Sequence, residues 1–175
     1  MTHQLAVTTI GADQPGIVAA VAEVLRDRGG NVEDSAMTVL GGQFAIMLLV
    51  TTDDPADQLR QALEVATRDL GLRVTVVPVE EGHATTDPTH TLSVYGRDRP
   101  GILAAVARAL AELGVNITDL STRMLPPEDQ PVYAMVLEIS LPEGVPPERL
   151  ELVLREVGER VGVDHTLRPL EPATY

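Results

Sequence analysis

Two stretches of the chain carry the side chains best suited to bind a small charged molecule. They are residues 11–17 and 96–102, about 85 residues apart, and each places an aspartate shortly before a Pro-Gly pair. An aspartate carboxylate can accept hydrogen bonds from an ammonium group. The start of a helix offers unpaired N–H groups and a partial positive charge to a carboxylate. Together these groups could bind a small molecule that carries both charges within a few ångströms.

The predicted ligand-binding residues are the turn residues of each copy and the asparagine that follows the next glycine. An asparagine amide can donate and accept at once, and a glycine lets a ligand approach the backbone. They are Asp13, Gln14, Pro15, Gly16, Ile17 and Asn31 in the first copy, and Asp98, Arg99, Pro100, Gly101, Ile102 and Asn116 in the second.

Each of these residue types also has a purely structural interpretation. An aspartate before Pro-Gly is a common helix cap, with the proline in the first turn of the helix. An asparagine after a glycine tolerates a left-handed turn. Glycines such as Gly11 and Gly96 are common turn-formers. The sequence leaves both interpretations open, because a duplicated architecture would repeat these residues with or without a ligand.

The two turns differ in charge. Gln14 and Ala12 in the first copy correspond to Arg99 and Arg97 in the second. The two arginines flank Asp98, so they could pair with it, hold a carboxylate in a bidentate grip, or remain solvated on the surface. If only one turn binds an anion, we expect it to be the second.

The elements around the first turn follow from periodicity. Residues 5–10 read as a strand ended by Gly11. Ile17, Val21 and Leu25 then recur at helical spacing, and the apolar stripe is widened by Val18, Ala22 and Val24. Further along lie two strand-like runs joined by Gly-Gly, a second helix that ends before Gly71, and a closing strand over residues 72–79.

The second copy repeats this order, with a longer hairpin loop at residues 126–131. We predict an α+β fold of two tandem ferredoxin-like βαββαβ units, each a four-stranded antiparallel sheet with two helices on one face. The predicted domains are residues 1–79 and 89–171, joined by a linker over residues 80–88. The last residues should fray.

The composition argues against several classes of protein, among them nucleic-acid-binding and membrane proteins. The chain has 13 Lys+Arg against 26 Asp+Glu, which gives a net charge of −13, so a phosphate backbone would repel it and direct nucleic-acid binding is not expected. There is no cysteine, no signal-peptide pattern and no apolar run long enough for a membrane helix. We expect a soluble cytoplasmic protein.

Neither a catalytic nor a metal-binding pattern is present. The four histidines lack metal-ligand spacing, and no serine stands in a nucleophile elbow. We therefore predict no catalytic residue, no metal, no cofactor and no enzymatic activity.

The two turns, each with Gly29-Gly30-Asn31 or Gly114-Val115-Asn116 downstream, resemble the ACT domain family. The pattern occurs twice, and the two copies together cover nearly the whole chain. Such a pair most resembles the regulators related to the glycine cleavage system transcriptional repressor. It implies binding of a small amino acid at interfaces between ACT units, near the turn and the start of the second strand, with allosteric signalling to a partner protein. The edge strands and the aliphatic sheet lead us to expect a homodimer as well.

Two alternatives remain open at this point. The same turn opens the formyltetrahydrofolate deformylases, so the chain could be a regulatory subunit or fragment related to those enzymes. It could also be an assembly module whose ligand sites have been lost.

Overall fold

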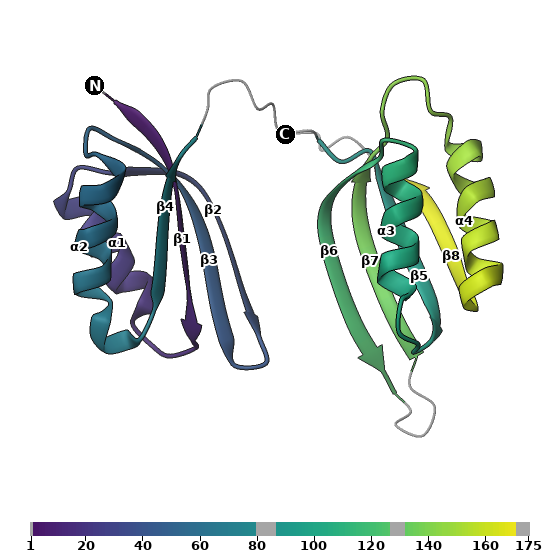
Figure 1. Ribbon diagram of the computed structural model, residues 1–175, viewed down its shortest axis with the longest axis horizontal. Helices are drawn as coiled ribbons and strands as arrows, with labels where there is room; N and C mark the ends of the chain where they lie inside the picture. The colour runs from purple at the N-terminus through teal and green to yellow at the C-terminus, as the bar shows by residue number, and fades with distance from the viewer. Residues whose placement is uncertain (1, 80–86, 127–131, 171–175) are drawn as a thin grey trace. The chain divides into compact units, whose positions relative to one another are not determined.

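The computed structural model describes residues 2–79, 87–126 and 132–170 (Figure 1). The chain divides into two compact units, Met1–His83 and Ala84–Tyr175. The division falls within the predicted linker, most of which, residues 80–86, lies outside the described residues. The predicted tail beyond residue 170 also lies outside them.

Unit 1 contains four strands, two α-helices and one short 3₁₀ helix. They are β1 (His3–Ala12), α1 (Ile17–Asp27), β2 (Asn31–Leu40), β3 (Gln43–Thr52), α2 (Ala56–Ala66), η1 (Arg68–Leu70) and β4 (Arg73–Pro78).

Unit 2 repeats the order of strands and α-helices. Its elements are β5 (His90–Arg97), α3 (Ile102–Glu112), β6 (Asn116–Leu125), β7 (Val132–Ser140), α4 (Pro147–Val161) and β8 (Val163–Pro169).

The strand order is β2-β3-β1-β4 in unit 1 and β6-β7-β5-β8 in unit 2, and all neighbours are antiparallel. Figure 1 shows that both helices of each unit cover the same face of its sheet. The predicted pair of ferredoxin-like units is confirmed. Each central strand, β1 or β5, leads directly into the turn that precedes the first helix of its unit.

The buried core is aliphatic in unit 2, and in unit 1 it is aliphatic apart from Phe44, in line with the 2% aromatic content. In α1 the predicted stripe of Ile17, Val21 and Leu25 is buried against the sheet, and α3 buries Ile102, Val106 and Leu110 in the same way. Of the residues predicted to widen this stripe, Val24 is partly buried against the core, whereas Ala22 and Val18, which is 47% exposed, are not buried.

Three local expectations had different outcomes. Gly41 and Gly42 both have left-handed φ angles, 57° and 76°, which confirms the predicted two-residue hairpin. The second hairpin loop lies largely outside the described residues, at 127–131. The second helix of unit 1 was predicted to run to Gly71, but α2 ends at Ala66. There the buried Thr67 hydroxyl donates to the Leu63 carbonyl at 2.8 Å.

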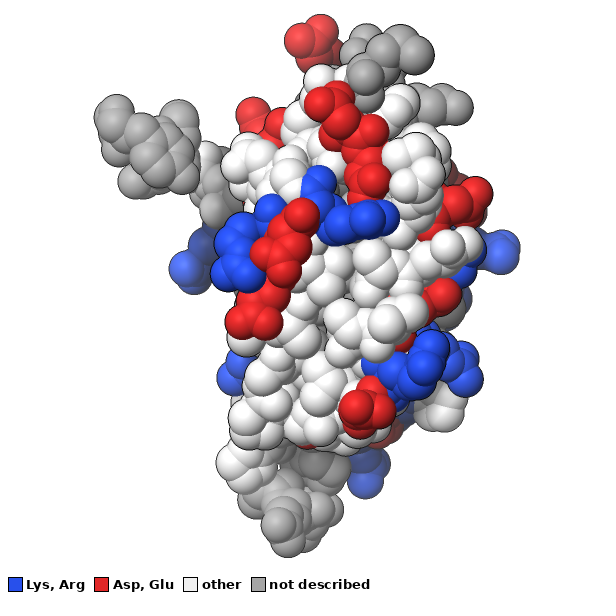
Figure 2. All heavy atoms as spheres, turned by 90° about the vertical axis from the view of Figure 1, so that its left-hand side faces the viewer, with Lys and Arg blue, Asp and Glu red and all other residues white. Residues whose placement is uncertain are grey.

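Acidic and basic side chains are intermixed on the helix-covered side of unit 1 (Figure 2). Arg60 lies 2.7 Å from Glu64 and 3.6 Å from Asp57 along α2, and Arg28 lies 2.7 Å from Asp54 between α1 and the loop before α2. Among the described residues, no helix is long and apolar enough to cross a membrane.

Candidate functional site

The first turn is anchored to the hairpin beside it. The Asp13 N–H donates to the Gly42 carbonyl at 2.8 Å. The helix α1 then begins at Ile17, with Gly16 as its N-cap at φ 96°. Pro15 therefore precedes the helix, and the prediction that it occupies the first helical turn is wrong. The left-handed backbone at Gly16 breaks the helical path between Pro15 and Ile17.

No side chain caps α1. Its first backbone hydrogen bond runs from Ala20 N–H to Gly16 C=O at 2.9 Å, so the three N–H groups before it have no helical partner. The capping interpretation of Asp13 is therefore wrong. Within the described residues, the Asp13 carboxylate makes no hydrogen bond or ion pair. A Cβ at Gly16 would meet nothing within 4 Å, so the helix start is open to solvent.

The second turn has the same backbone geometry. Gly101 caps α3 at φ 98° without a side-chain cap, and Ala105 N–H donates to its carbonyl at 2.9 Å. Unit 2 differs in the neighbour of its aspartate. Burial, and then the nearby charge of Asp98, raise the pKa of the Tyr133 hydroxyl. At the equivalent register position of unit 1 stands Phe44, which has no hydroxyl.

Gln14 and Arg99 both reach the junction between the second helix and the last strand of their units. Gln14 Nε2 donates to the Leu70 carbonyl at 2.9 Å, beside Gly71. Arg99 Nη1 lies 3.4 Å from the position that a Cβ at Gly162 would occupy. Gln14 is therefore held by a hydrogen bond within its own unit. Arg99 lies next to a groove described below.

Gly11 and Gly96 do not form turns, contrary to the structural interpretation given above. Both lie inside strands, paired with Phe44 and Tyr133. A Cβ at Gly96 would lie 2.8 Å from the Gly162 carbonyl oxygen, and one at Gly11 would lie 2.7 Å from Leu72 Cδ2. The absence of a side chain lets the last strand approach closely. A glycine within a strand-like run was the available signal.

The two asparagines are not close to the turn of their own unit. Asn31 pairs with Thr51, and Thr51 pairs with Gln4 near the start of β1, whereas Asp13 follows the end of β1. The length of β1 separates them by about 30 Å, at roughly 3.3 Å per residue. Asn116 likewise begins β6, opposite Ser140 at the end of β7.

The left-handed interpretation of the asparagines is also wrong. No residue other than glycine has a positive φ in the described ranges, and Gly29 and Gly114 take that conformation at 68° and 70°. Asn31 and Asn116 are the exposed first residues of their strands. A single small ligand therefore cannot touch both the turn and the asparagine of the same unit.

The side chains at the remaining positions have separate roles. Ile17 and Ile102 are each 2% exposed and belong to the cores, so they can offer a ligand only backbone groups. Within residues 2–79, 87–126 and 132–170, no group of three His, Asp or Glu side chains is placed to hold a metal ion.

Two family models match the chain, each described as an ACT domain, over residues 3–77 and 90–157. The chain is a tandem ACT domain protein. The two matches include both turns and both asparagines, and they agree with the two units of the structure.

The ACT pair has relatives of different kinds. It is 34% identical over 164 residues to a phosphoserine phosphatase of Mycobacterium tuberculosis, covering 90% of this chain but 39% of that protein. It is 27% identical over 143 residues to the glycine cleavage system transcriptional repressor of Escherichia coli, covering 79% of this chain and 74% of the repressor. The chain is thus similar to that repressor over most of both proteins, whereas it spans less than half the length of the phosphatase.

A solved structure has the same tandem fold. A crystal structure of an unknown protein from Galdieria sulphuraria matches 98% of this chain and all of its own, with a TM-score of 0.85 and 29% identity. This likeness covers both ACT units.

Proposed function

We propose that this protein is a non-enzymatic regulator that binds a small amino acid at its ACT turns and signals to a partner protein in the cytoplasm. The regulated process would be amino-acid or one-carbon metabolism, as the repressor relative suggests. The acidic surface favours action through a protein partner rather than through direct contact with DNA.

One observation carries the proposal: in each unit an uncapped helix start lies beside an aspartate whose carboxylate makes no hydrogen bond or ion pair within the described residues. The N–H groups of Ile17, Val18 and Ala19 offer donors and a partial positive charge to a carboxylate. The Asp13 carboxylate, which has no partner among the described residues, offers acceptors to an ammonium group. The pair is complementary to the α-amino and α-carboxyl groups of an amino acid, and α3 repeats it with Asp98.

The position of the asparagines supports a site shared between ACT units. Since Asn31 lies at the opposite end of the sheet from Asp13, it would reach a ligand held at the turn of another unit. Binding would then change how tightly two units pack, which is a direct route to allosteric signalling.

The edge of unit 1 supports assembly as a homodimer. β2 is an edge strand, so the backbone groups on its outer side have no neighbouring strand in the sheet. All ten of its residues are exposed. Val32, Met37 and Val39 pair in register with core residues of β3, yet each is more than 40% exposed. A second ACT unit placed along β2 would cover this apolar strip.

A thermal-shift series with the common amino acids tests the proposal, using the wild type and the variants Asp13→Ala and Asp98→Ala. A ligand at 100 times its Kd should stabilise the protein by about 2.7 kcal/mol. Each variant should weaken the response, and Asp87→Ala, which removes an exposed carboxylate outside the turns, should leave it unchanged. Absence of any response would contradict the proposal. A response that survives both turn substitutions would place the site elsewhere.

A second candidate is favoured by the phosphatase match, which spans 90% of this chain. On that interpretation the ACT pair regulates an enzyme by binding to it, and the ligand acts on that enzyme's activity. Affinity capture with and without the stabilising amino acid would distinguish the two. Ligand-dependent capture of a metabolic enzyme would support the second candidate, and ligand-dependent capture of a transcription factor the first.

A further inference from the structure

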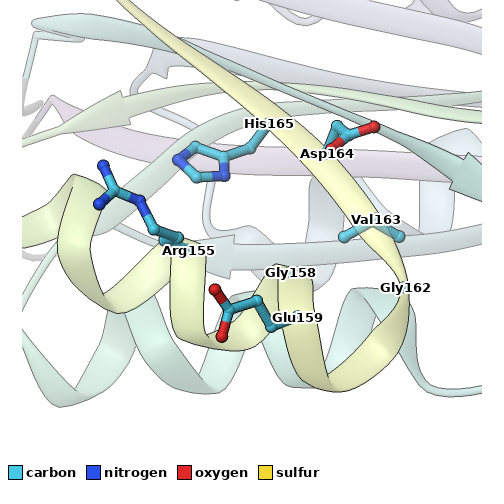
Figure 3. Close-up of a pocket in the computed structure, with 7 residues that line it drawn as sticks. All are labelled: Arg155, Gly158, Glu159, Gly162, Val163, Asp164 and His165. Carbon is cyan, nitrogen blue, oxygen red and sulfur yellow. The ribbon is translucent and has the colours of Figure 1, made fainter.

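A groove of about 440 Å³ lies between α4 and β8 of unit 2. Its lining brings two cationic or protonatable side chains, one carboxylate and two glycines into one place (Figure 3). These are Arg155, His165, Glu159, Gly158 and Gly162.

The glycines explain why the groove exists. A Cβ at Gly158 would lie 2.5 Å from the Val163 carbonyl oxygen, so only glycine lets α4 lie this close to β8. Gly162 ends the helix at φ 74° and turns the chain directly into β8. The groove floor is therefore backbone, and the charged side chains stand around it.

The charges around the groove are of both signs. Arg155 projects from α4 and His165 from the helix-facing side of β8, while Glu159 follows one helical turn after Arg155 (Figure 3). Asp164 contributes to the lining, but its side chain lies on the other side of β8. Although Arg155 and Glu159 have the spacing of a helical ion pair, neither makes an ion pair or hydrogen bond within the described residues.

Unit 1 lacks this arrangement. Gly71 corresponds to Gly162. The carbonyl oxygen of Gly71 lies close to Gly11 in β1, and the carbonyl oxygen of Gly162 lies close to Gly96 in β5. Counted from these glycines, Arg155 corresponds to Glu64, which is paired with Arg60 at 2.7 Å, and His165 corresponds to Val74. At these equivalent positions, unit 1 therefore lacks the arginine and the histidine that line the groove of unit 2.

We propose that the groove binds a small zwitterion. Arg155 and His165 hold its carboxylate, and Glu159 holds its ammonium group. A simple anion is a poorer fit, because Glu159 and the partially negative end of α4 would repel it. The groove shares the class of ligand with the turns proposed above, but it is complete within one ACT unit and each site can exist without the other.

Titration of the ¹⁵N-labelled full-length protein with glycine, followed by NMR, tests the groove. Glycine should shift the amide resonances of residues 158–165. The substitution Arg155→Ala should weaken this binding about ten- to hundredfold, since hydrogen bonds to charged groups contribute about 1.5–3 kcal/mol. Arg149→Ala removes an exposed arginine of the same helix outside the groove, and should have no effect.

Acetate, methylammonium and inorganic phosphate serve as comparison probes. Each should bind more weakly than glycine, and Glu159→Gln should weaken glycine binding without weakening acetate binding. Phosphate that binds as tightly as glycine, or glycine binding unaffected by Arg155→Ala and Glu159→Gln, would overturn the zwitterion site. Glycine shifts confined to residues 13–18 or 98–103 would also overturn it while supporting the turn site. Glycine shifts confined to residues 158–165 would support the groove and contradict glycine binding at the turns.

Discussion

The side-chain amide of Gln14 donates a 2.9 Å hydrogen bond from Nε2 to the main-chain oxygen of Leu70. This bond joins the turn before α1 to the end of the 3₁₀ helix η1, 56 residues later. It removes Gln14 from the set of free side chains at the turn, so the groups left for the proposed ligand are the Asp13 carboxylate and the backbone N–H groups of α1.

Replacing Gln14 by alanine should destabilise unit 1 by about 1 kcal/mol, because a partly buried carbonyl loses its donor. Urea unfolding monitored on unit 1 resonances measures the change. Gln43→Ala, an exposed residue at the start of β3, is the control and should leave the unfolding midpoint unchanged. Equal effects of the two substitutions would contradict the role given to the Leu70 bond.

Gly96→Ala should destabilise its unit more than Gly11→Ala does. The new methyl group would meet backbone in unit 2, at 2.8 Å from the Gly162 oxygen and 3.0 Å from Val163 Cα. In unit 1 the closest atom, at 2.7 Å, is the end of the Leu72 side chain, which can rotate away. We expect about 1–3 kcal/mol for Gly96→Ala and less for Gly11→Ala. Thermal unfolding of the two variants gives the comparison, and the opposite order would contradict the close strand approach.

Arg28→Ala should destabilise unit 1 by about 1 kcal/mol. Arg28 Nε lies 2.7 Å from Asp54 Oδ2, and the Asp54 side chain is only 16% exposed, so removing the cation leaves a largely buried carboxylate unpaired. Denaturant unfolding at low and high salt measures this contribution. Arg26→Ala is the matched control, because Arg26 pairs with its exposed neighbour Asp27. It should cause no measurable change.

The stability of unit 2 should fall at alkaline pH through Tyr133. Burial and the charge of Asp98 raise the pKa of its hydroxyl in the folded state above the unfolded value of about 10. The folded state therefore holds this proton more tightly. The resulting stabilisation is complete below about pH 10 and is lost as the pH rises through the folded pKa.

Denaturant unfolding between about pH 8 and 11 tests this sign. Tyr133→Phe should remove this part of the alkaline loss, whereas Tyr95→Phe, a change at a 40% exposed residue, should retain it. Asp98→Asn should lower the pKa of Tyr133 only in part, since burial is the larger cause. A greater loss in Tyr133→Phe than in the wild type would reverse the assignment.

Val39→Glu should dissociate the proposed homodimer. Val39 lies on β2 in register with the core residue Phe44, yet 44% of it is exposed, and a charge there could not be buried by a second ACT unit. Light scattering after size-exclusion chromatography gives the oligomeric state. Val65→Glu, at a 62% exposed position on α2, should remain a dimer. A monomeric wild type, or a dimer that tolerates Val39→Glu, would exclude this edge as the interface.

Much of the fold could be predicted because its signals are local and occur twice. The spacing of Ile17, Val21 and Leu25 indicates one buried helix face, and Gly41-Gly42 indicates a two-residue hairpin. The repeat of the turn about 85 residues later separates the chain into two similar units. Each of these inferences depends only on local sequence patterns and not on contacts between residues far apart in the chain.

The candidate site was predicted only in part, because its parts depend on contacts between distant segments. Whether Asp13 caps α1 depends on the backbone angle at Gly16, and whether Gln14 is free depends on Leu70. The groove beside α4 had no sequence signal of its own, since Arg155 and His165 become neighbours only when α4 packs closely on β8.

The sequence by itself determined that this protein has two ACT units with aliphatic cores, a marked acidity and a repeated aspartate at each turn. Local periodicity and composition carry that information. Only the tertiary structure decided that Asn31 lies about 30 Å from Asp13, at the opposite end of the same sheet. The reason is physical: strand register, which sets this distance, follows from pairing across the whole unit rather than from any single stretch of the chain.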